Sequence, residues 1–173
     1  MKNYILIIIV MISFLSCKTS KELPTVEVVD INKYAGTWYE IARLPNKFEK
    51  GLTCVSATYT LKSNEKIEVL NKGYFLDEKG KFKDIKGTAW VPNVKFQGRL
   101  KVRFFWPFAG DYYIISLDEN YKYALVGDPS RKYLWILSKN KNLDNKIYSE
   151  LLEVAKINGF SIEKLIIINQ ECN

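Results

Sequence analysis

The feature that most constrains the fold is a succession of short segments in which apolar and polar residues alternate with a period of two. Such alternation is typical of a β-strand that has one buried and one exposed face. The segments are also rich in the β-branched and aromatic residues that strands favour. They are Thr37–Leu44, Thr53–Leu61, Ile67–Phe75, Lys83–Val91, Arg99–Phe105, Tyr112–Leu117, Tyr123–Val126 and Tyr133–Leu137. The sequence therefore predicts an all-β protein.

The connections between these segments are short and carry turn-forming residues, as in Asp77–Gly80 and Asp128–Ser130. Short connections favour antiparallel neighbours in an up-and-down order. Closure into a barrel removes the sheet edges and leaves an interior just wide enough for one small ligand. We therefore expect an eight-stranded antiparallel up-and-down β-barrel, with a two-sheet sandwich as the alternative.

Near the C-terminus the period changes to that of a helix. The pattern begins after Asp144, which suits an N-cap, and ends before Gly159, which suits a helix stop. Its apolar residues fall on one helical face and are Ile147, Leu151, Val154 and Ala155. We expect one C-terminal α-helix packed against the outside of the barrel, followed by a last strand within Lys164–Asn169.

The start of the chain has the features of a signal peptide. One Lys precedes the apolar run Tyr4–Ile12, which is too short to span a bilayer of about 30 Å. After this run come Ser13 to Ser16 and then Cys17, and a Cys directly after Leu15-Ser16 resembles a bacterial lipoprotein processing site. We expect residues 1–16 to be removed, Cys17 to be acylated, residues 17–29 to form a lipidated tether, and residues 30–173 to form the folded domain. An ordinary secreted protein with an incidental Cys is the alternative.

The composition argues against most hydrolases. The chain contains no His, the commonest general base and the partner in Ser–His and Cys–His nucleophilic pairs. We expect no metal and no cofactor. The net charge of +7 is spread over single residues, which indicates a solvated basic surface or a weak attraction to anionic lipid. Because no basic stripe is interleaved with aromatic residues, we expect no nucleic-acid partner.

The alternation also predicts which side chains face the interior. In one segment Leu100 and Phe104 share a face opposite the charged Lys101 and Arg103. Applied to the other segments, this gives an interior with isolated polar groups among apolar ones, as in small-molecule sites. The residues expected to line a ligand-binding interior are Tyr59, Asn71, Phe104, Tyr112 and Trp135. Periodicity alone leaves open whether these side chains surround a ligand or simply fill the barrel.

The segment Gly36–Arg43, with the sequence Gly-Thr-Trp-Tyr-Glu-Ile-Ala-Arg, resembles the first signature of the lipocalin family, in which Gly-x-Trp begins the first strand. Further matching segments include Val69–Tyr74 and Tyr133–Leu137. The extended match is similar to the branch of the family that holds bacterial outer-membrane lipoprotein lipocalins and apolipoprotein D. The resemblance covers about Asp30–Gln170 and implies the barrel fold and an interior that holds a ligand.

The resemblance also implies how one end of the barrel closes. In the family, a basic residue after the last barrel strand packs over the Trp of the first strand. Here those roles fall to Gly36, Trp38 and Lys139. The family usually has Arg at the last position, and Lys supplies a cation without the planar stacking of Arg.

Cys54 and Cys172 remain once Cys17 is acylated, and an oxidising compartment favours one disulfide. The resemblance to apolipoprotein D implies that the start of the second strand is joined to the C-terminal tail at these two positions. A disulfide that closes so long a loop stabilises by about 4 to 5 kcal/mol in the chain-entropy model. A free Cys54 that acts as a nucleophile, as in lipocalin isomerases, is the alternative.

The resemblance implies a membrane-anchored binding and transport protein, not an enzyme. Its expected ligands are small hydrophobic or amphiphilic molecules such as fatty acids and lysophospholipids. Its expected location is the bacterial outer membrane, lipid-anchored and facing the periplasm, as a monomer or homodimer. The rival hypothesis is a lipid-modifying enzyme or isomerase that uses Glu40 or Cys54 as its reactive group.

Overall fold

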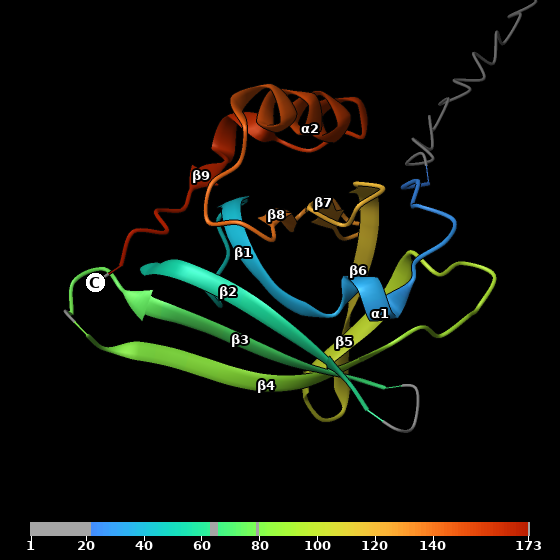
Figure 1. Ribbon diagram of the computed structural model, residues 1–173, viewed down its shortest axis with the longest axis horizontal. Helices are drawn as coiled ribbons and strands as arrows, with labels where there is room; N and C mark the ends of the chain where they lie inside the picture. Colours follow the sequence, from blue (N-terminus) through green and yellow to red (C-terminus); the bar gives the residue numbers. More distant parts are fainter. Residues whose placement is uncertain (1–21, 63–65, 79, 173) are drawn as a thin grey trace, which may run out of the picture.

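The computed structural model describes residues 22–62, 66–78 and 80–172, and its strands form a closed barrel (Figure 1). The eight barrel strands are β1 (Gly36–Arg43), β2 (Leu52–Leu61), β3 (Ile67–Phe75), β4 (Phe82–Trp90), β5 (Arg99–Phe105), β6 (Phe108–Leu117), β7 (Tyr123–Gly127) and β8 (Leu134–Ser138). Consecutive strands pair antiparallel, and β1 closes the sheet by pairing with both β2 and β8. The predicted barrel is therefore confirmed, and the two-sheet sandwich is wrong.

The β5–β6 hairpin differs most from its predicted boundaries. Phe105 pairs with Phe108, so the turn contains two residues and β6 begins before the predicted start at Tyr112. The sequence pattern misses this extension because it includes Gly110, a residue type that is depleted in strands. In the structure Gly110 nevertheless pairs with Val102 of β5.

The barrel has two different ends. We call the end at which β1 begins the base, and the opposite end, which carries the β3–β4 and β5–β6 turns, the rim. A short helix, α1 (Ile31–Tyr34), directly precedes β1 at the base. Asp30 caps α1 by accepting a hydrogen bond from the backbone N–H of Asn32 at 3.0 Å. This helix was not predicted, because four residues are too few to show a helical period.

The helix α2 (Asn145–Ile157) packs against the outside of the barrel (Figure 1). Asp144 is its N-cap, as predicted, and accepts two backbone N–H groups of the first turn. Leu151 and Ala155 are buried and form one apolar cluster with Leu134 and Ile136 of β8. The predicted external helix is confirmed, and its contacts account for the outward-facing apolar residues of β8.

After α2 the chain returns to the barrel. A single 3-10 turn, η1 (Ile162–Lys164), leads into β9 (Ile166–Ile167), which pairs with the rim end of β1. The last strand expected within Lys164–Asn169 is therefore present but only two residues long.

The first described residues lie along the barrel wall. Leu23 and Val29 are buried, and the backbone N–H of Val26 donates to the carbonyl oxygen of Ile114 at 2.9 Å. The final part of the predicted tether thus contacts the barrel. The predicted signal peptide and Cys17 lie outside the described residues. Within the described part of the chain, no helix is long and apolar enough to cross a membrane.

Candidate functional site

The barrel interior is an apolar cluster that is most tightly packed at the base. Its buried strand residues come from the inner faces of all eight strands. They are Trp38, Tyr59, Ile67, Val69, Ala89, Leu100, Ile114, Ala124, Val126 and Leu137. Each of these side chains is 4 % exposed or less. The base of the barrel is therefore a solid core.

Closer to the rim, the inward-facing side chains keep accessible surface. Phe104, Tyr112 and Trp135 pack against the inner cluster but are only partly buried. Asn71 is also partly buried and shares a face of β3 with the buried Val69. The interior is therefore less closely packed toward the rim than at the base. Of the five residues predicted to line a ligand site, Asn71, Phe104 and Trp135 lie in this upper part, and Tyr112 lies between it and the base, opposite Leu100.

Tyr59, the fifth predicted residue, lies deeper, and its hydroxyl belongs to a chain of three tyrosines. The hydroxyl of Tyr112 is 2.7 Å from that of Tyr34 and 2.8 Å from that of Tyr59. Burial raises the pKa of all three hydroxyls well above their ordinary value. All three tyrosine hydroxyls are therefore protonated at neutral pH. Tyr34 was not predicted, because it lies in α1 outside the alternating segments.

Asn71 brings a second polar group to the inner face. Its Oδ1 atom is buried without a hydrogen-bond partner, which is uncommon for a polar side-chain atom. Among the described residues, only Arg99 Nε shares that property. A buried, unpaired acceptor gains free energy when a donor is supplied. Asn71 therefore carries an unpaired acceptor on the inner face of β3.

A network of charged side chains lies beside the rim end of β1. Arg43 Nη1 donates to Glu40 Oε1 at 2.5 Å, and Arg43 Nη2 donates to the carbonyl oxygen of Glu49 at 2.7 Å. Trp135 Nε1 donates to Glu49 Oε2 at 3.1 Å. This network orients Trp135, one of the predicted lining residues, and occupies the guanidinium of Arg43.

Within this network, burial raises the pKa of the Glu40 carboxyl well above its ordinary value, the negative charge of Glu49 adds to the rise, and Arg43 opposes it. Glu40 is 3 % exposed and bonded to Arg43, so it is not accessible as the reactive group of the rival enzyme hypothesis. Arg43 and Glu49 were not predicted as site residues. A bulge between Glu40 and Ala42 breaks the alternation before Arg43, and Glu49 lies in a loop without a period.

At the base, the Lys139 ammonium lies over the Trp38 ring, 4.5 Å from its centroid. Lys139 Nζ also donates to the carbonyl oxygen of Ala35 at 2.5 Å, and Trp38 Nε1 donates to that of Tyr34 at 2.7 Å. Gly36 has a φ of +96°, which favours glycine, and a Cβ there would lie 3.3 Å from Lys139 Nζ. The three residues that the family resemblance assigns to the closed end thus lie together.

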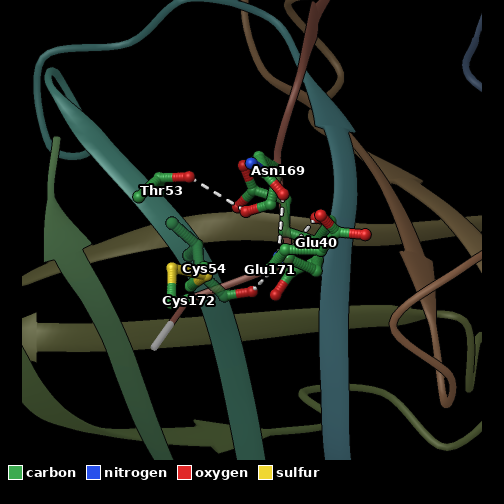
Figure 2. Close-up of a disulfide and its surroundings, with 8 residues drawn as sticks. Glu40, Thr53, Cys54, Asn169, Glu171 and Cys172 are labelled. Carbon is green, nitrogen blue, oxygen red and sulfur yellow. Dashed lines mark hydrogen bonds between the residues drawn. A yellow bond between two sulfur atoms is a disulfide. The ribbon is translucent and has the colours of Figure 1, made fainter.

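Cys54 and Cys172 form a disulfide between β2 and the C-terminal tail, with their Cα atoms 6.2 Å apart (Figure 2). Cys54 has a φ of +47° at a bulge in β2. Its backbone N–H and the Thr53 hydroxyl both donate to the carbonyl oxygen of Asn169, each at 2.9 Å. Because the sulfur of Cys54 is bonded to Cys172, it offers no free thiol, and the structure gives no support to the thiol-dependent enzyme.

Buried Gln170 fixes the tail beside this disulfide. Its side-chain Nε2 donates to the carbonyl oxygens of Glu40 in β1 and Val55 in β2, at 2.7 and 2.9 Å. The tail therefore joins the two strands near the rim. Toward this end β1 no longer pairs with β2 and pairs with β8 and β9 instead.

Outside the barrel interior, the described residues were also compared with the requirements of a metal site. No group of three His, Cys, Asp or Glu side chains is placed to hold a metal ion in residues 22–62, 66–78 and 80–172.

A hollow of about 550 Å³ lies between Pro24–Val28 and Val94–Arg99, and none of the five predicted lining residues contributes to it. This hollow is formed by the N-terminal segment and the β4–β5 connection.

Comparisons with known proteins agree with this architecture. The family model for a lipocalin-like domain matches residues 29–170. The chain is 43 % identical to the outer membrane lipoprotein Blc of Vibrio cholerae, over 82 % of this chain and 83 % of that protein. It is 36 % identical to apolipoprotein D of Macaca fascicularis, over 86 % and 80 % of the two chains. Insecticyanin from Manduca sexta has the same fold, with a TM-score of 0.69, 23 % identity and coverage of 86 % and 84 %.

These findings also bear on location and function. The relatives named outer membrane lipoprotein support the location expected from the start of the sequence, a lipid-anchored protein of the outer membrane. Family membership supports binding of small hydrophobic ligands. With its closed barrel, its Gly36–Arg43 signature and these matches, the chain belongs to the lipocalin family.

Proposed function

We propose that this protein binds and carries fatty acids or lysophospholipids in the bacterial cell envelope, with their acyl chains inside the barrel. The observation that carries the proposal is the difference between the two halves of the interior. The base is packed, whereas Phe104 and Trp135 face inward near the rim, Tyr112 faces inward below them opposite Leu100, and all three keep accessible surface. An acyl chain that enters from the rim is stabilised by contact with these side chains.

The energetics of such binding do not require specific polar recognition. Each methylene that moves from water into an apolar interior contributes about 0.8 kcal/mol. The charged end of a fatty acid or lysophospholipid stays at the rim in contact with water, because Arg43 is already bonded to Glu40 and Glu49. Burial of an unpaired charge in the interior would cost far more than a few methylenes gain.

The second part of the proposal is a lipid anchor that holds the protein at the membrane. The predicted acylation of Cys17, after removal of residues 1–16, would attach the protein to the membrane by more than one acyl chain, which stable anchoring requires. The tether of residues 17–29 and a periplasmic orientation remain predictions. Attachment close to the bilayer would suit a protein that exchanges acyl chains with it.

The test is a fluorescence titration with N-phenyl-1-naphthylamine, a neutral apolar probe. The chain carries Cys17→Ser, so that it has no acyl chains and no detergent competes for the interior. We expect saturable binding, displaced by dodecanoate and by lysophosphatidylcholine. Trp135→Ala should weaken binding about three- to tenfold, because it removes a large apolar contact.

Trp90→Ala is the matched control. Trp90 follows the inward-facing Ala89 on β4, so it points outward, and its ring lies 5.6 Å from the guanidinium of Arg103. We expect this variant to bind the probe like the parent chain. Absence of saturable probe binding to the folded parent chain would refute the proposed function. Mass spectrometry of the native extract tests the enzyme alternative, since a carrier retains intact lipid whereas an enzyme releases altered products.

A further inference from the structure

The three tyrosines of the interior have one hydrogen-bond donor more than they use. Tyr34, Tyr59 and Tyr112 carry three O–H protons, but only two hydrogen bonds connect their oxygens. Each of these bonds uses one proton. These hydroxyls make no other hydrogen bond within the described part of the chain. Whichever way these two bonds are directed, one O–H donor is left without an acceptor among the described residues.

Tyr112 is the member of this chain that a ligand can approach. Tyr34 and Tyr59 are 1 % and 4 % exposed, whereas Tyr112 is partly accessible. Tyr112 is also the central member, and its oxygen has two lone pairs. When Tyr34 and Tyr59 both donate to it, the proton of Tyr112 is the one left over. The unused donor then lies where the packed base meets the more open upper interior.

The surroundings of this donor suit a neutral group and not an anion. Arg43 is the single buried cation among the described residues, and its guanidinium is bonded to Glu40 and to the backbone of Glu49. Burial raises the pKa of the Tyr59 hydroxyl, and the negative charge of Glu49 adds to this rise. An ionised carboxylate or phosphate at this depth would therefore meet no buried cation that is free to pair with it.

We propose that the tyrosine chain binds an uncharged oxygen at the buried end of a lipid, so that the barrel also takes long-chain alcohols and esters with their oxygen inward. This inference rests on the proposed function and adds a second class of ligand and a second orientation. An ionised fatty acid binds with its carboxylate at the rim, whereas an alcohol binds with its hydroxyl at Tyr112. Asn71 Oδ1, two residues along β3 from the strand partner of Tyr59, is an unpaired acceptor on the same inner face.

The experiment compares 1-dodecanol with dodecanoate as competitors of N-phenyl-1-naphthylamine, in the Cys17→Ser chain and in the same chain with Tyr112→Phe. The Phe ring keeps the apolar contact and removes the hydroxyl. Loss of one hydrogen bond should weaken dodecanol about three- to tenfold at pH 8. Dodecanoate should change less than twofold, because its oxygen atoms lie at the rim. Tyr113→Phe is the control, since Tyr113 packs against the outer cluster beneath α2.

A second measurement already tests the inference in the parent chain and is repeated in the variant. The carbonyl stretch of methyl dodecanoate, labelled with ¹³C at the carbonyl carbon, moves to lower wavenumber when the oxygen accepts a hydrogen bond. We expect the bound ester to show the lowered band in the parent chain and the unshifted band in Tyr112→Phe. An unshifted band in the parent chain, or equal weakening of dodecanol and dodecanoate by Tyr112→Phe, would overturn the inference and leave the proposed function intact. Failure of the probe itself to bind would instead refute the proposed function.

Discussion

The ammonium of Lys139 lies over the ring of Trp38, 4.5 Å from its centroid, and connects the end of the last barrel strand to the beginning of the first. Burial lowers the pKa of this ammonium below its ordinary value. The hydrogen bond from Lys139 Nζ to Ala35 fixes the same cation to the backbone that follows α1. A single side chain therefore holds together the short helix, the first strand and the last strand at the base.

Replacement of Lys139 by Met should lower the free energy of unfolding by about 1 to 2 kcal/mol, because it removes the cation from the Trp38 face and a charge-assisted hydrogen bond. Urea unfolding followed by Trp fluorescence measures the change. Lys139→Arg keeps a cation and adds a planar face for stacking, so it should be at least as stable as the parent. Equal losses in both variants would show that the cation itself contributes nothing.

The disulfide should contribute a large part of the stability. It closes a loop with a sequence separation of 118 residues, for which the chain-entropy model gives about 4 to 5 kcal/mol. The paired substitution Cys54→Ser with Cys172→Ser should lower the urea midpoint and leave the fold intact, because Gln170 still bridges β1 and β2. Reduction of the parent chain should lower the midpoint by the same amount. A reduced parent chain as stable as the oxidised one would contradict this prediction.

Glu40 should make stability fall as the pH rises. Its carboxyl has a raised pKa in the folded protein, so the folded state holds its proton at pH values where the unfolded state has lost it. The stabilising contribution is complete below the ordinary Glu pKa of about 4.3 and is lost as the pH rises through the folded-state pKa.

Glu40→Gln mimics the protonated carboxyl and does not titrate. The stability of this variant relative to the parent should therefore increase between pH 5 and pH 8. Urea unfolding of both chains at several pH values measures the difference. Glu163→Gln, in the exposed 3-10 turn, is the control and should show no such trend. A difference that shrinks with rising pH would contradict the raised pKa.

The docking of α2 depends on Leu151, which is 3 % exposed against the outer face of the barrel. Leu151→Ala should lower the free energy of unfolding by about 2 to 4 kcal/mol, because it leaves a cavity between helix and sheet. Glu153→Ala, on the exposed face of the same helix, should change it by less than about 0.5 kcal/mol. Probe binding by Leu151→Ala should be unchanged at a temperature where the variant is folded, since α2 lies outside the interior.

The barrel follows from the sequence because period-two alternation reports directly which face of each strand is buried. The same rule placed Phe104, Tyr112 and Trp135 inside. It fails where the backbone departs from that period. Because of the bulge between Glu40 and Ala42, the alternation does not show that Arg43 faces inward. Tyr34 was missed because the four residues of α1 are too few to show a period.

Hydrogen bonds between distant residues could not be predicted either. The chain from Tyr34 through Tyr112 to Tyr59 joins α1, β6 and β2, which are far apart in the sequence. The bond between Trp135 and Glu49 spans 86 residues. No local pattern encodes such pairs. Only the closed sheet brings them together, so the polar part of the candidate site required the three-dimensional structure.

A crystal structure of the Cys17→Ser chain with 12-bromododecanoic acid tests the central claim most directly, because the bromine gives an anomalous signal at the end of the acyl chain. We expect a bromine peak inside the barrel beside Phe104 and Tyr112, with the carboxylate at the rim. A bromine peak confined to the outer hollow near Val94–Arg99, or an interior filled by side chains without ligand, would contradict it.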